Sequence, residues 1–339
     1  MTAFKVALVG GLRGQDVPEW VSERLRAENI DFAARECMSR QELAEIAGDA
    51  DVVWVYGDHQ TVYAENLDVL ARCGAIIRTG SGTDNIPVPE ATALGIIVAN
   101  TPEAISDSVS NHAIGLLFAV IRQIAKQDRL MRRGVWDRYA GWPDWHLSGQ
   151  ALGLVGFGHI GRLVARKMAG FDMTILAHDP VVPAEVMARF GVQTVAFDDL
   201  LAQADFVSLH CPLIPSTYHL IDERALRLMK PKAVLINTSR GPVVDETALF
   251  RALNEGWIAG AGLDVFEQEP TPVDNPLLAL DNVVVTPHIG GYSDEFYDNF
   301  WRFSVETAID FAKGRMPRSY VNRDVKPRWT LAERDASGD

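Results

Sequence analysis

The chain has 339 residues, of which 47% are hydrophobic and 23% charged, a composition typical of a globular protein. Its length exceeds that of most single hydrophobic cores, so two domains are expected. The net charge of −13 argues against nucleic acid or an anionic membrane as the main partner, and it means that an anionic substrate needs a local cluster of cationic side chains.

Cysteine usage and the length of the apolar runs narrow the class of protein further. Cys37, Cys73 and Cys211 are odd in number and lack metal-type spacing, which predicts reduced thiols and no metal site. No segment reaches the length of a membrane span, and no leader pattern precedes the apolar run at residues 4–9. We therefore expect a cytoplasmic protein that does not bind membranes.

The first hundred residues alternate apolar runs with helical patterns, which predicts a parallel α/β unit. We expect buried strands at residues 4–9, 30–33, 51–56 and 75–79, with residues 95–100 closing the unit. The glycine pair at 10–11 is interpreted as a strand-to-helix turn rather than a phosphate loop, because no Gly-x-x-Gly or Lys follows in register.

A glycine-rich loop, residues 78–86, follows one of these strands at the edge where open α/β sheets bind ligands. Its glycines, Gly80 and Gly82, could expose backbone N–H groups to a carboxylate, as in a nest-like anion site. A flexible connection explains the same spacing equally well, so the residues alone leave both interpretations open.

One long helical pattern covers residues 102–133 and is apolar over more than one face. Such a helix must be buried in a large core or against a second subunit. Trp136, Trp142 and Trp145 follow it, and aromatic side chains of this kind anchor interfaces. We therefore favour a homodimer formed by the helix and by the segment 136–145, although the role of the three tryptophans is not decided by the sequence.

The segment 151–179 has the order strand, glycine turn, helix, strand and acid, which is typical of a dinucleotide-binding unit. Gly156 permits the tight turn, Gly158 lets the backbone approach a pyrophosphate, and Gly161 lets the helix pack closely on the strand.

The helix that follows this turn begins near His159 and Ile160, and its N-terminus supplies unpaired N–H groups and the positive end of the helix dipole. Asp179 lies about twenty residues past the glycines, where a carboxylate can bind both ribose hydroxyls. Because that carboxylate would repel a 2′-phosphate, we predict that the cofactor is NAD(H), preferred over NADP(H).

The second half of the chain continues as a doubly wound parallel sheet. Strand patterns recur at residues 192–196, 205–210, 233–238, 260–265 and 283–287, and a last amphipathic helix covers 297–311. We expect a discontinuous substrate-binding domain of residues 1–100 and 292–325, a cofactor-binding domain of residues 101–291, and a charged tail, 326–339, with little to bury.

Three of the later strands end in reactive side chains: Arg240 after the first, Asp264, Glu267 and Glu269 after the second, and His288 after the third. If the strands are parallel, these groups emerge at one edge of the sheet. An Arg can bind a carboxylate, a His can exchange a proton with an alcohol or ketone oxygen, and a Glu can favour the imidazolium form. Spacing alone does not rank Glu267 against Glu269, and each residue taken singly also fits a surface ion pair or a loop hydrogen bond.

From about residue 50 to 320 the chain resembles the D-isomer-specific 2-hydroxyacid dehydrogenase family. The matching motifs are GSGTDNI (80–86), NTPEAISDSV (100–109), LGLVGFGHIGR (152–162), HCPL (210–213), NTSRGPVVDE (237–246), GLDVFEQEP (262–270) and TPHIGG (286–291). The resemblance implies an α/β protein of two Rossmann-like domains, a doubly wound NAD-binding domain and a flavodoxin-like substrate domain, with the active site in a cleft between them.

The resemblance also implies roles for individual residues. Arg240, Glu269 and His288 would be catalytic, with Glu269 rather than Glu267 as the family's glutamate. Further cofactor contacts would come from Thr101, His210, Pro212, Thr238 and Asp264, the last near the nicotinamide carboxamide. The substrate would be bound by Arg240, His288 and the backbone of Ser81 and Gly82, with Arg78 holding a second anionic group if the substrate has one.

Two departures from the family pattern and several alternatives accompany this assignment. Asn111 stands where many relatives carry Glu, and we expect no C-terminal regulatory domain, unlike in many phosphoglycerate dehydrogenases. The resemblance implies a homodimer in which a neighbour's tryptophan, for which we favour Trp142, reaches the active site. The alternatives are an NAD(H)-sensing corepressor-like protein, a phosphoglycerate dehydrogenase-like enzyme acting on a dianion, and a formate or phosphite dehydrogenase. The sequence names neither the 2-keto acid nor the direction of the reaction in the cell.

Overall fold

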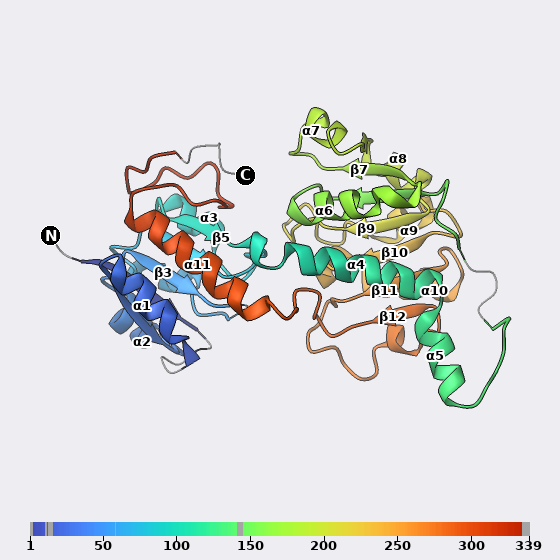
Figure 1. Ribbon diagram of the computed structural model, residues 1–339, viewed down its shortest axis with the longest axis horizontal. Coiled ribbons are helices and arrows are strands. Elements are labelled where there is room, and N and C mark those ends of the chain that lie inside the picture. Colours follow the sequence, from blue (N-terminus) through green and yellow to red (C-terminus); the bar gives the residue numbers. More distant parts are fainter. Residues whose placement is uncertain (1–2, 11, 13–15, 58, 141–144, 334–339) are drawn as a thin grey trace. The chain divides into compact units, whose positions relative to one another are not determined.

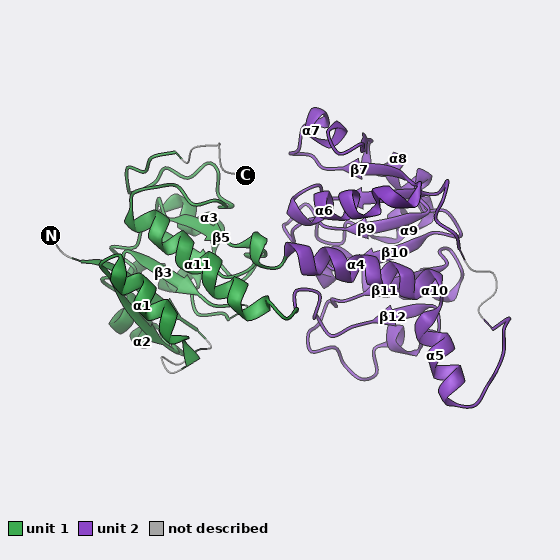
Figure 2. Ribbon diagram, viewed as in Figure 1, with its two compact units in different colours: residues 1–105, 293–339 green, residues 106–292 purple. Residues whose placement is uncertain are grey.

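The computed structural model describes residues 3–10, 12, 16–57, 59–140 and 145–333. The chain forms two compact units, one of residues 1–105 with 293–339 and one of residues 106–292 (Figure 2). In the colouring of Figure 1, the red C-terminal helix belongs to the same unit as the blue N-terminal strands. The first unit is therefore discontinuous in sequence.

A parallel sheet of five strands forms the centre of the first unit, in the order β2-β1-β3-β4-β5 that is typical of flavodoxin-like folds. Its strands are β1 (Phe4–Val9), β2 (Ile30–Arg35), β3 (Val52–Val55), β4 (Ala75–Arg78) and β5 (Ile97–Asn100). Its helices are α1 (Glu19–Ala27), α2 (Arg40–Ala47), α3 (Val88–Ala93) and α11 (Phe296–Ala312), with short 3-10 turns at η2 (Ala64–Val69) and η3 (Pro102–Ala104).

The last helix of the chain completes the core of this first unit. Trp54 on β3 is fully buried, and its ring lies 5.4 Å from that of Trp301 on α11, centroid to centroid. Strands β3, β4 and β5 are buried at every residue, which is the pattern of a parallel sheet covered on both faces.

The second unit is built on seven parallel strands in the order β12-β11-β10-β9-β6-β7-β8. These are β6 (Ala151–Val155), β7 (Thr174–His178), β8 (Gln193–Thr194), β9 (Phe206–Leu209), β10 (Val234–Asn237), β11 (Gly260–Leu263) and β12 (Val283–Val285). The helices are α4 (Ser106–Ile121), α5 (Ile124–Arg132), α6 (His159–Met168), α7 (Ala184–Ala188), α8 (Phe197–Gln203), α9 (Glu223–Leu228) and α10 (Glu246–Asn254), with 3-10 turns η4 (Ala169–Phe171), η5 (Gly241–Val243) and η6 (Pro276–Ala279).

The strand order of this second sheet reverses between β6 and β9, because β7 and β8 extend it on one side and β10 to β12 on the other. Open α/β sheets bind ligands at the carboxyl ends of the strands beside such a reversal. Both sheets are parallel throughout, which confirms the predicted architecture of two Rossmann-like units.

The prediction of a single helix over 102–133 is wrong. The segment forms η3, α4 and α5, and it breaks at Gln123, whose φ of 49° is left-handed. The apolar residues of α4, Leu116 and Leu117 among them, pack in the core of their own unit beside α6. Helix α5 buries no residue. The breadth of the apolar pattern therefore reflects a helix enclosed by its own unit.

The tryptophans that follow α5 have different environments. Trp136 is 73% exposed, whereas Trp145 packs against the core beside α4 and donates its indole N–H to the carbonyl oxygen of Lys232 at 3.1 Å. Trp145 thus has a role within its own unit, which the interface interpretation did not include. Trp142 lies outside the described residues.

The expectation that the C-terminal segment has little to bury does not hold for residues 326–333. The Arg328 guanidinium donates to the carbonyl oxygens of Leu94, Ala71 and Cys73. The Trp329 ring packs at 5.8 Å from the ring of Phe4. One arginine and one tryptophan therefore attach a charged segment to the first unit.

Candidate active site

The turn after β6 is shaped by glycines that no other residue could replace without distortion. Gly156 has a φ of +95°, and a Cβ there would lie 2.7 Å from the carbonyl carbon of His210. A Cβ at Gly161 would overlap the carbonyl oxygen of Gly156. Around Gly158, by contrast, no atom lies within 4 Å of the Cβ position, so the backbone is open on that side. Gly158 precedes α6 directly, and the helix offers its first N–H groups there.

Asp179 lies at the rim of this glycine turn, just after β7. One of its carboxylate oxygens accepts a hydrogen bond from the backbone N–H of Phe157 at 2.8 Å. The other accepts from the N–H groups of Val181 and Val182 at 2.8 and 3.0 Å. The chain itself therefore holds this carboxylate beside the turn that precedes α6.

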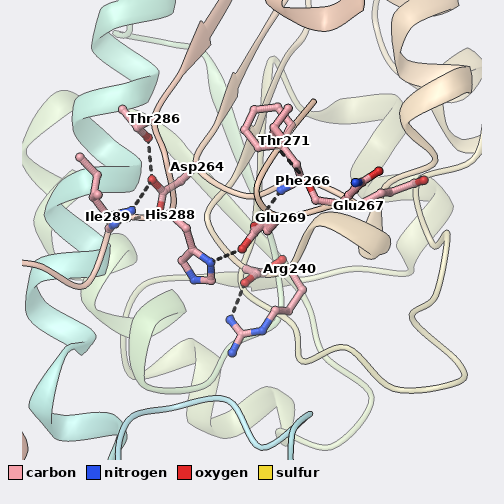
Figure 3. A network of polar contacts seen from close by, with 12 residues as sticks. Arg240, Asp264, Phe266, Glu267, Glu269, Thr271, Thr286, His288 and Ile289 are labelled. Carbon is pink, nitrogen blue, oxygen red and sulfur yellow. Dashed lines mark hydrogen bonds and ion pairs between the residues drawn. The ribbon is translucent and has the colours of Figure 1, made fainter. Parts of the chain in front are cut away.

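Arg240, Glu269 and His288 follow β10, β11 and β12, which are neighbours in the sheet. The Nδ1 atom of His288 and Oε2 of Glu269 are 2.6 Å apart, and Oε1 of Glu269 accepts the backbone N–H of Phe266 at 3.0 Å. Figure 3 shows the Arg240 guanidinium beside this pair, where its Nη1 donates to the carbonyl oxygen of Ser239 at 2.8 Å. The parallel sheet thus brings together the three side chains that the sequence placed at strand ends.

The charge of Glu269 follows from these contacts. Desolvation by burial raises the pKa of its carboxyl group. Hydrogen bonds from His288 and from the Phe266 N–H, together with the charges of His288 and Arg240, lower the pKa by more than burial raises it, so the net shift is downward. Glu269 is therefore a carboxylate near neutral pH, which favours a protonated neighbour.

Glu267, which spacing did not distinguish from Glu269, has different partners. Its Oε1 lies 2.9 Å from Nε2 of His219 and accepts the backbone N–H of Glu246 at 3.1 Å. Glu246 in turn accepts the N–H of Glu267. This second acid connects surface loops through His219 and Glu246.

Asp264, at the end of β11, is 2% exposed and holds the segment that carries His288. Its carboxylate accepts hydrogen bonds from the Thr286 hydroxyl at 2.6 Å and from the N–H groups of Ile289 and Gly290 at 2.9 and 2.8 Å (Figure 3). Its carbonyl oxygen accepts the N–H of His288 at 2.7 Å. The sequence singled out Asp264 but not Thr286, whose hydroxyl is one of these partners.

The remaining residues predicted to bind the cofactor have varied surroundings. The Nε2 atom of His210 is 3.0 Å from the Ser208 hydroxyl, and burial lowers the pKa of this imidazole to about 4, so it is neutral. The Thr238 hydroxyl oxygen is buried and makes no hydrogen bond with any of the described residues. The carbonyl oxygen of Pro212 accepts the Thr217 hydroxyl at 2.6 Å. In the first unit, the Thr101 hydroxyl accepts the Gly80 N–H at 2.8 Å.

The glycine-rich loop after β4 is held by polar side chains of its own unit. Arg78 is 5% exposed, and its Nη1 donates to the carbonyl oxygen of Thr79 at 2.8 Å. The Asn100 amide donates to the Ser81 carbonyl oxygen at 2.7 Å, which fixes the far side of the loop. Within residues 3–333, as far as the structure describes them, the N–H groups of Ser81 and Gly82 donate no hydrogen bond.

The departure at Asn111 has a structural explanation. Its Oδ1 accepts from the Lys167 ammonium at 2.7 Å, and its Nδ2 donates to the Asp107 carboxylate at 3.1 Å. Asn111 therefore joins a cation on α6 to an acid at the start of α4, a connection that involves neither His288 nor Arg240.

In the described part of the chain, no group of three or more His, Cys, Asp or Glu side chains is arranged to hold a metal ion. None of the helices among the described residues combines the length and the apolar character that crossing a membrane requires.

Comparison with known proteins places this geometry in a family. Residues 114–290 match the family model of the D-isomer specific 2-hydroxyacid dehydrogenase NAD binding domain. The chain is 44% identical over 270 residues to a glyoxylate reductase of Korarchaeum cryptofilum, covering 77% of this chain and 80% of the relative.

Solved structures agree over almost the whole length. A D-lactate dehydrogenase from Aquifex aeolicus, complexed with NAD and lactic acid, is 28% identical with a TM-score of 0.78, covering 91% of this chain and 96% of that one. An NADPH-dependent glyoxylate/hydroxypyruvate reductase from Sinorhizobium meliloti, with NADP and malonate, is 29% identical with a TM-score of 0.80, covering 97% and 100%. The chain therefore belongs to the D-isomer specific 2-hydroxyacid dehydrogenase family, and it is an oxidoreductase that acts on the CH–OH group of hydroxy acids.

Proposed function

We propose that the chain is an NAD(H)-dependent reductase of small 2-keto acids of the glyoxylate and hydroxypyruvate class, which it interconverts with the corresponding D-2-hydroxy acids. The observation that carries this proposal is the 2.6 Å contact between His288 and Glu269 with Arg240 beside it. An acid–base pair and a guanidinium at one sheet edge provide the proton and the carboxylate binding that such a reaction requires.

In the proposed mechanism, His288 is the general acid and base. Glu269 accepts from Nδ1 of the ring, so Nε2 is the nitrogen that gives a proton to the ketone oxygen or takes it from the alcohol. Arg240 binds the substrate carboxylate and offsets the negative charge that develops on the carbonyl oxygen. The chemistry that a nicotinamide cofactor would supply, when bound, is hydride exchange with C2 of the substrate.

The residues of the second unit fit a dinucleotide. The open backbone at Gly158, the start of α6 and the buried hydroxyl of Thr238 offer hydrogen-bond donors and acceptors of the kind that a pyrophosphate and a nicotinamide riboside require. The groups that would hold it are Gly156, Gly158, His159, Ile160, Gly161, Asp179, His210, Pro212, Thr238 and Asp264. Solved relatives bind NAD in one case and NADP in another. The Asp179 carboxylate supports NAD(H), because its charge repels a 2′-phosphate.

The loop after β4 is proposed to bind the carboxylate of the substrate through the backbone N–H groups of Ser81 and Gly82. Arg78 is almost fully buried and bonded to the carbonyl oxygen of Thr79, which supports a role in shaping this loop. Its burial, with 5% of the residue exposed, argues against its binding a second anionic group. Small monoanionic acids are therefore favoured over phosphorylated ones.

The proposed enzyme is a homodimer. Helix α5 and the residues after it expose large apolar side chains, at Ile124, Met131, Val135, Trp136 and Tyr139. Exposed apolar groups in one contiguous segment are typical of subunit interfaces. The mass of the protein in solution, measured by light scattering, tests this assignment.

The activity is tested by the optical measurement of NADH consumption with glyoxylate, hydroxypyruvate, pyruvate, phenylpyruvate and 3-phosphohydroxypyruvate, with NADPH in parallel. We expect turnover of the small monoanionic acids with NADH. A preference for the phosphorylated acid would contradict the role given to Arg78. No turnover with any acid, while NADH still binds, would favour the sensor-like alternative.

A further inference from the structure

His112 of α4 contacts the network that holds the His288 segment, although no motif of the sequence marked it. Its Nε2 atom is 2.8 Å from the hydroxyl oxygen of Thr286 and 3.3 Å from Oδ1 of Asp264. The side chain is 23% exposed. A histidine on a helix so rich in apolar residues is thus turned toward a buried carboxylate.

The direction of these hydrogen bonds follows from counting protons. The Thr286 hydroxyl has one proton, and it donates that proton to Asp264 Oδ1 at 2.6 Å. Toward His112 the same oxygen can therefore only accept, so Nε2 of His112 carries the proton that is shared with Thr286 and Asp264. His112 is therefore the first donor in a series of hydrogen bonds that runs through the Thr286 hydroxyl to the Asp264 carboxylate.

The Asp264 carboxylate also binds the backbone next to His288. It accepts the N–H groups of Ile289 and Gly290, which follow His288 directly. His288 itself has a φ of 53°, a left-handed conformation that an L-residue keeps only where its surroundings impose it. A Cβ at Gly290 would lie 2.8 Å from Oδ2 of Asp264 and 3.5 Å from Cδ2 of His112, so this backbone packs directly on both side chains.

We propose that His112 is a positioning residue of the reaction: through Thr286 and Asp264 it fixes the backbone at residues 288–290 and thereby the orientation of the His288 ring toward Glu269. This inference rests on the proposed function of His288 as the acid and base. His112 is not assigned a contact with the substrate or the cofactor. Its effect is to keep a strained residue in the one conformation that brings its imidazole to Glu269.

The test compares four single variants with the unmodified protein. His112→Leu removes the donor, and His112→Gln restores an N–H at a similar reach. Thr286→Val removes the link between His112 and Asp264. Ser110→Ala is the matched control, because Ser110 is a fully buried polar residue of the same helix whose partners are Asp107 and Lys167 rather than the His288 segment. The measurements are kcat and KM for the best 2-keto acid, the pH profile of kcat/KM, the thermal midpoint and the NMR titration of the His288 ring.

We expect His112→Leu and Thr286→Val to lower kcat by about tenfold to a hundredfold, the range associated with small misplacements of a reacting group. KM for the keto acid should change little, and the pH profile and the His288 titration should both shift. His112→Gln should recover most of the activity, and Ser110→Ala should lower the thermal midpoint without moving either pH curve. The double variant of His112 and Thr286 should be little worse than either single one, since both break the same connection.

The inference is overturned if His112→Leu keeps the pH profile and the His288 titration of the unmodified protein, whether or not its thermal midpoint falls. Additive losses in the double variant would overturn it as well. If His112→Leu does not fold, Thr286→Val carries the same comparison with a much smaller change in shape. The NMR titration needs no substrate. An inactive parent protein would therefore refute the proposed function, and the His288 titrations of the variants would still test the positioning role of His112.

Discussion

Nδ1 of His288 donates a hydrogen bond to Oε2 of Glu269 at 2.6 Å, although 19 residues separate the two in the chain. The ring stands after β12 and the carboxylate after β11, so the register of two neighbouring strands brings them together. Because Nδ1 is engaged by Glu269, the opposite nitrogen of the ring is the one available for proton exchange with a substrate.

Replacing His288 by Ala removes that proton donor. We expect turnover of the 2-keto acid to fall by roughly two to four orders of magnitude, the usual contribution of a general acid. NADH binding, followed by fluorescence titration, should be retained because the glycine turn after β6 does not depend on this side chain. Loss of NADH binding would mean that His288 has a structural role instead.

Glu269→Gln tests the electrostatic part of the pair. The pKa of Glu269 is lowered by its partners, so the residue carries a negative charge that favours protonated His288. Without this charge the ring loses its proton at lower pH, and the alkaline limb of the pH profile for keto acid reduction should move to lower pH. Glu267→Gln is the matched control, because Glu267 pairs with His219 and its removal should leave the limb in place.

Gly241→Ala tests how closely the Arg240 and Glu269 loops are packed. A Cβ at Gly241 would overlap the carbonyl group of Phe266, so the two loops must separate to admit it. We expect a loss of stability of about 1–3 kcal/mol, as for other overpacked sites, together with a lower kcat/KM. Gly170→Ala, where no atom lies within 4 Å of the Cβ position, should change neither quantity. Equal behaviour of the two variants in chemical unfolding and kinetics would refute the packing argument.

Asp179→Asn separates charge from hydrogen bonding in cofactor choice. The amide keeps one oxygen that can accept the Phe157 N–H, so the glycine turn should remain, although the acceptor shared by the Val181 and Val182 N–H groups is lost. Removal of the negative charge should raise the kcat/KM for NADPH relative to that for NADH by about tenfold, equivalent to about 1.4 kcal/mol. An unchanged ratio would show that other groups select the cofactor.

The buried imidazole of His210 predicts acid sensitivity of the fold. Burial lowers its pKa from 6.5 to about 4, so between these values the unfolded chain binds a proton that the folded protein excludes. Stability is therefore full above pH 6.5 and falls as the pH drops toward 4, by up to about 3 kcal/mol for this group. Urea unfolding of the cofactor-free protein at several pH values should show this slope, and His210→Gln should flatten it. An identical slope in the variant would assign the acid sensitivity to other groups.

Local patterns in the sequence predicted those features that depend on short stretches of chain. The glycine turn at Gly156 and the acid at Asp179 belong to one βαβ unit, and their spacing alone fixed their arrangement. Spacing could not identify the partner of His288, because Glu267 and Glu269 are two residues apart. The family resemblance favoured Glu269, and the tertiary contact agrees with it.

Other features depend on the three-dimensional structure in the same way. The break of the predicted helix at Gln123 depends on a left-handed backbone that its side chain does not indicate. Trp145 is indistinguishable in sequence from an interface residue, yet its ring fills a site beside α4. His112 is a single histidine in an apolar helix, and its contact with Asp264 is visible only in the three-dimensional structure.

The discontinuity of the first unit has a consequence for how the protein is made. During synthesis the strands β1 to β5 emerge first, but Trp54 of β3 lacks its cover until Trp301 and the rest of α11 have left the ribosome. The second unit, residues 106–292, is contiguous and can close its core while the chain is still growing. The unit that begins first is thus completed last, and its apolar sheet face is the surface that a chaperone would need to shield in the nascent chain.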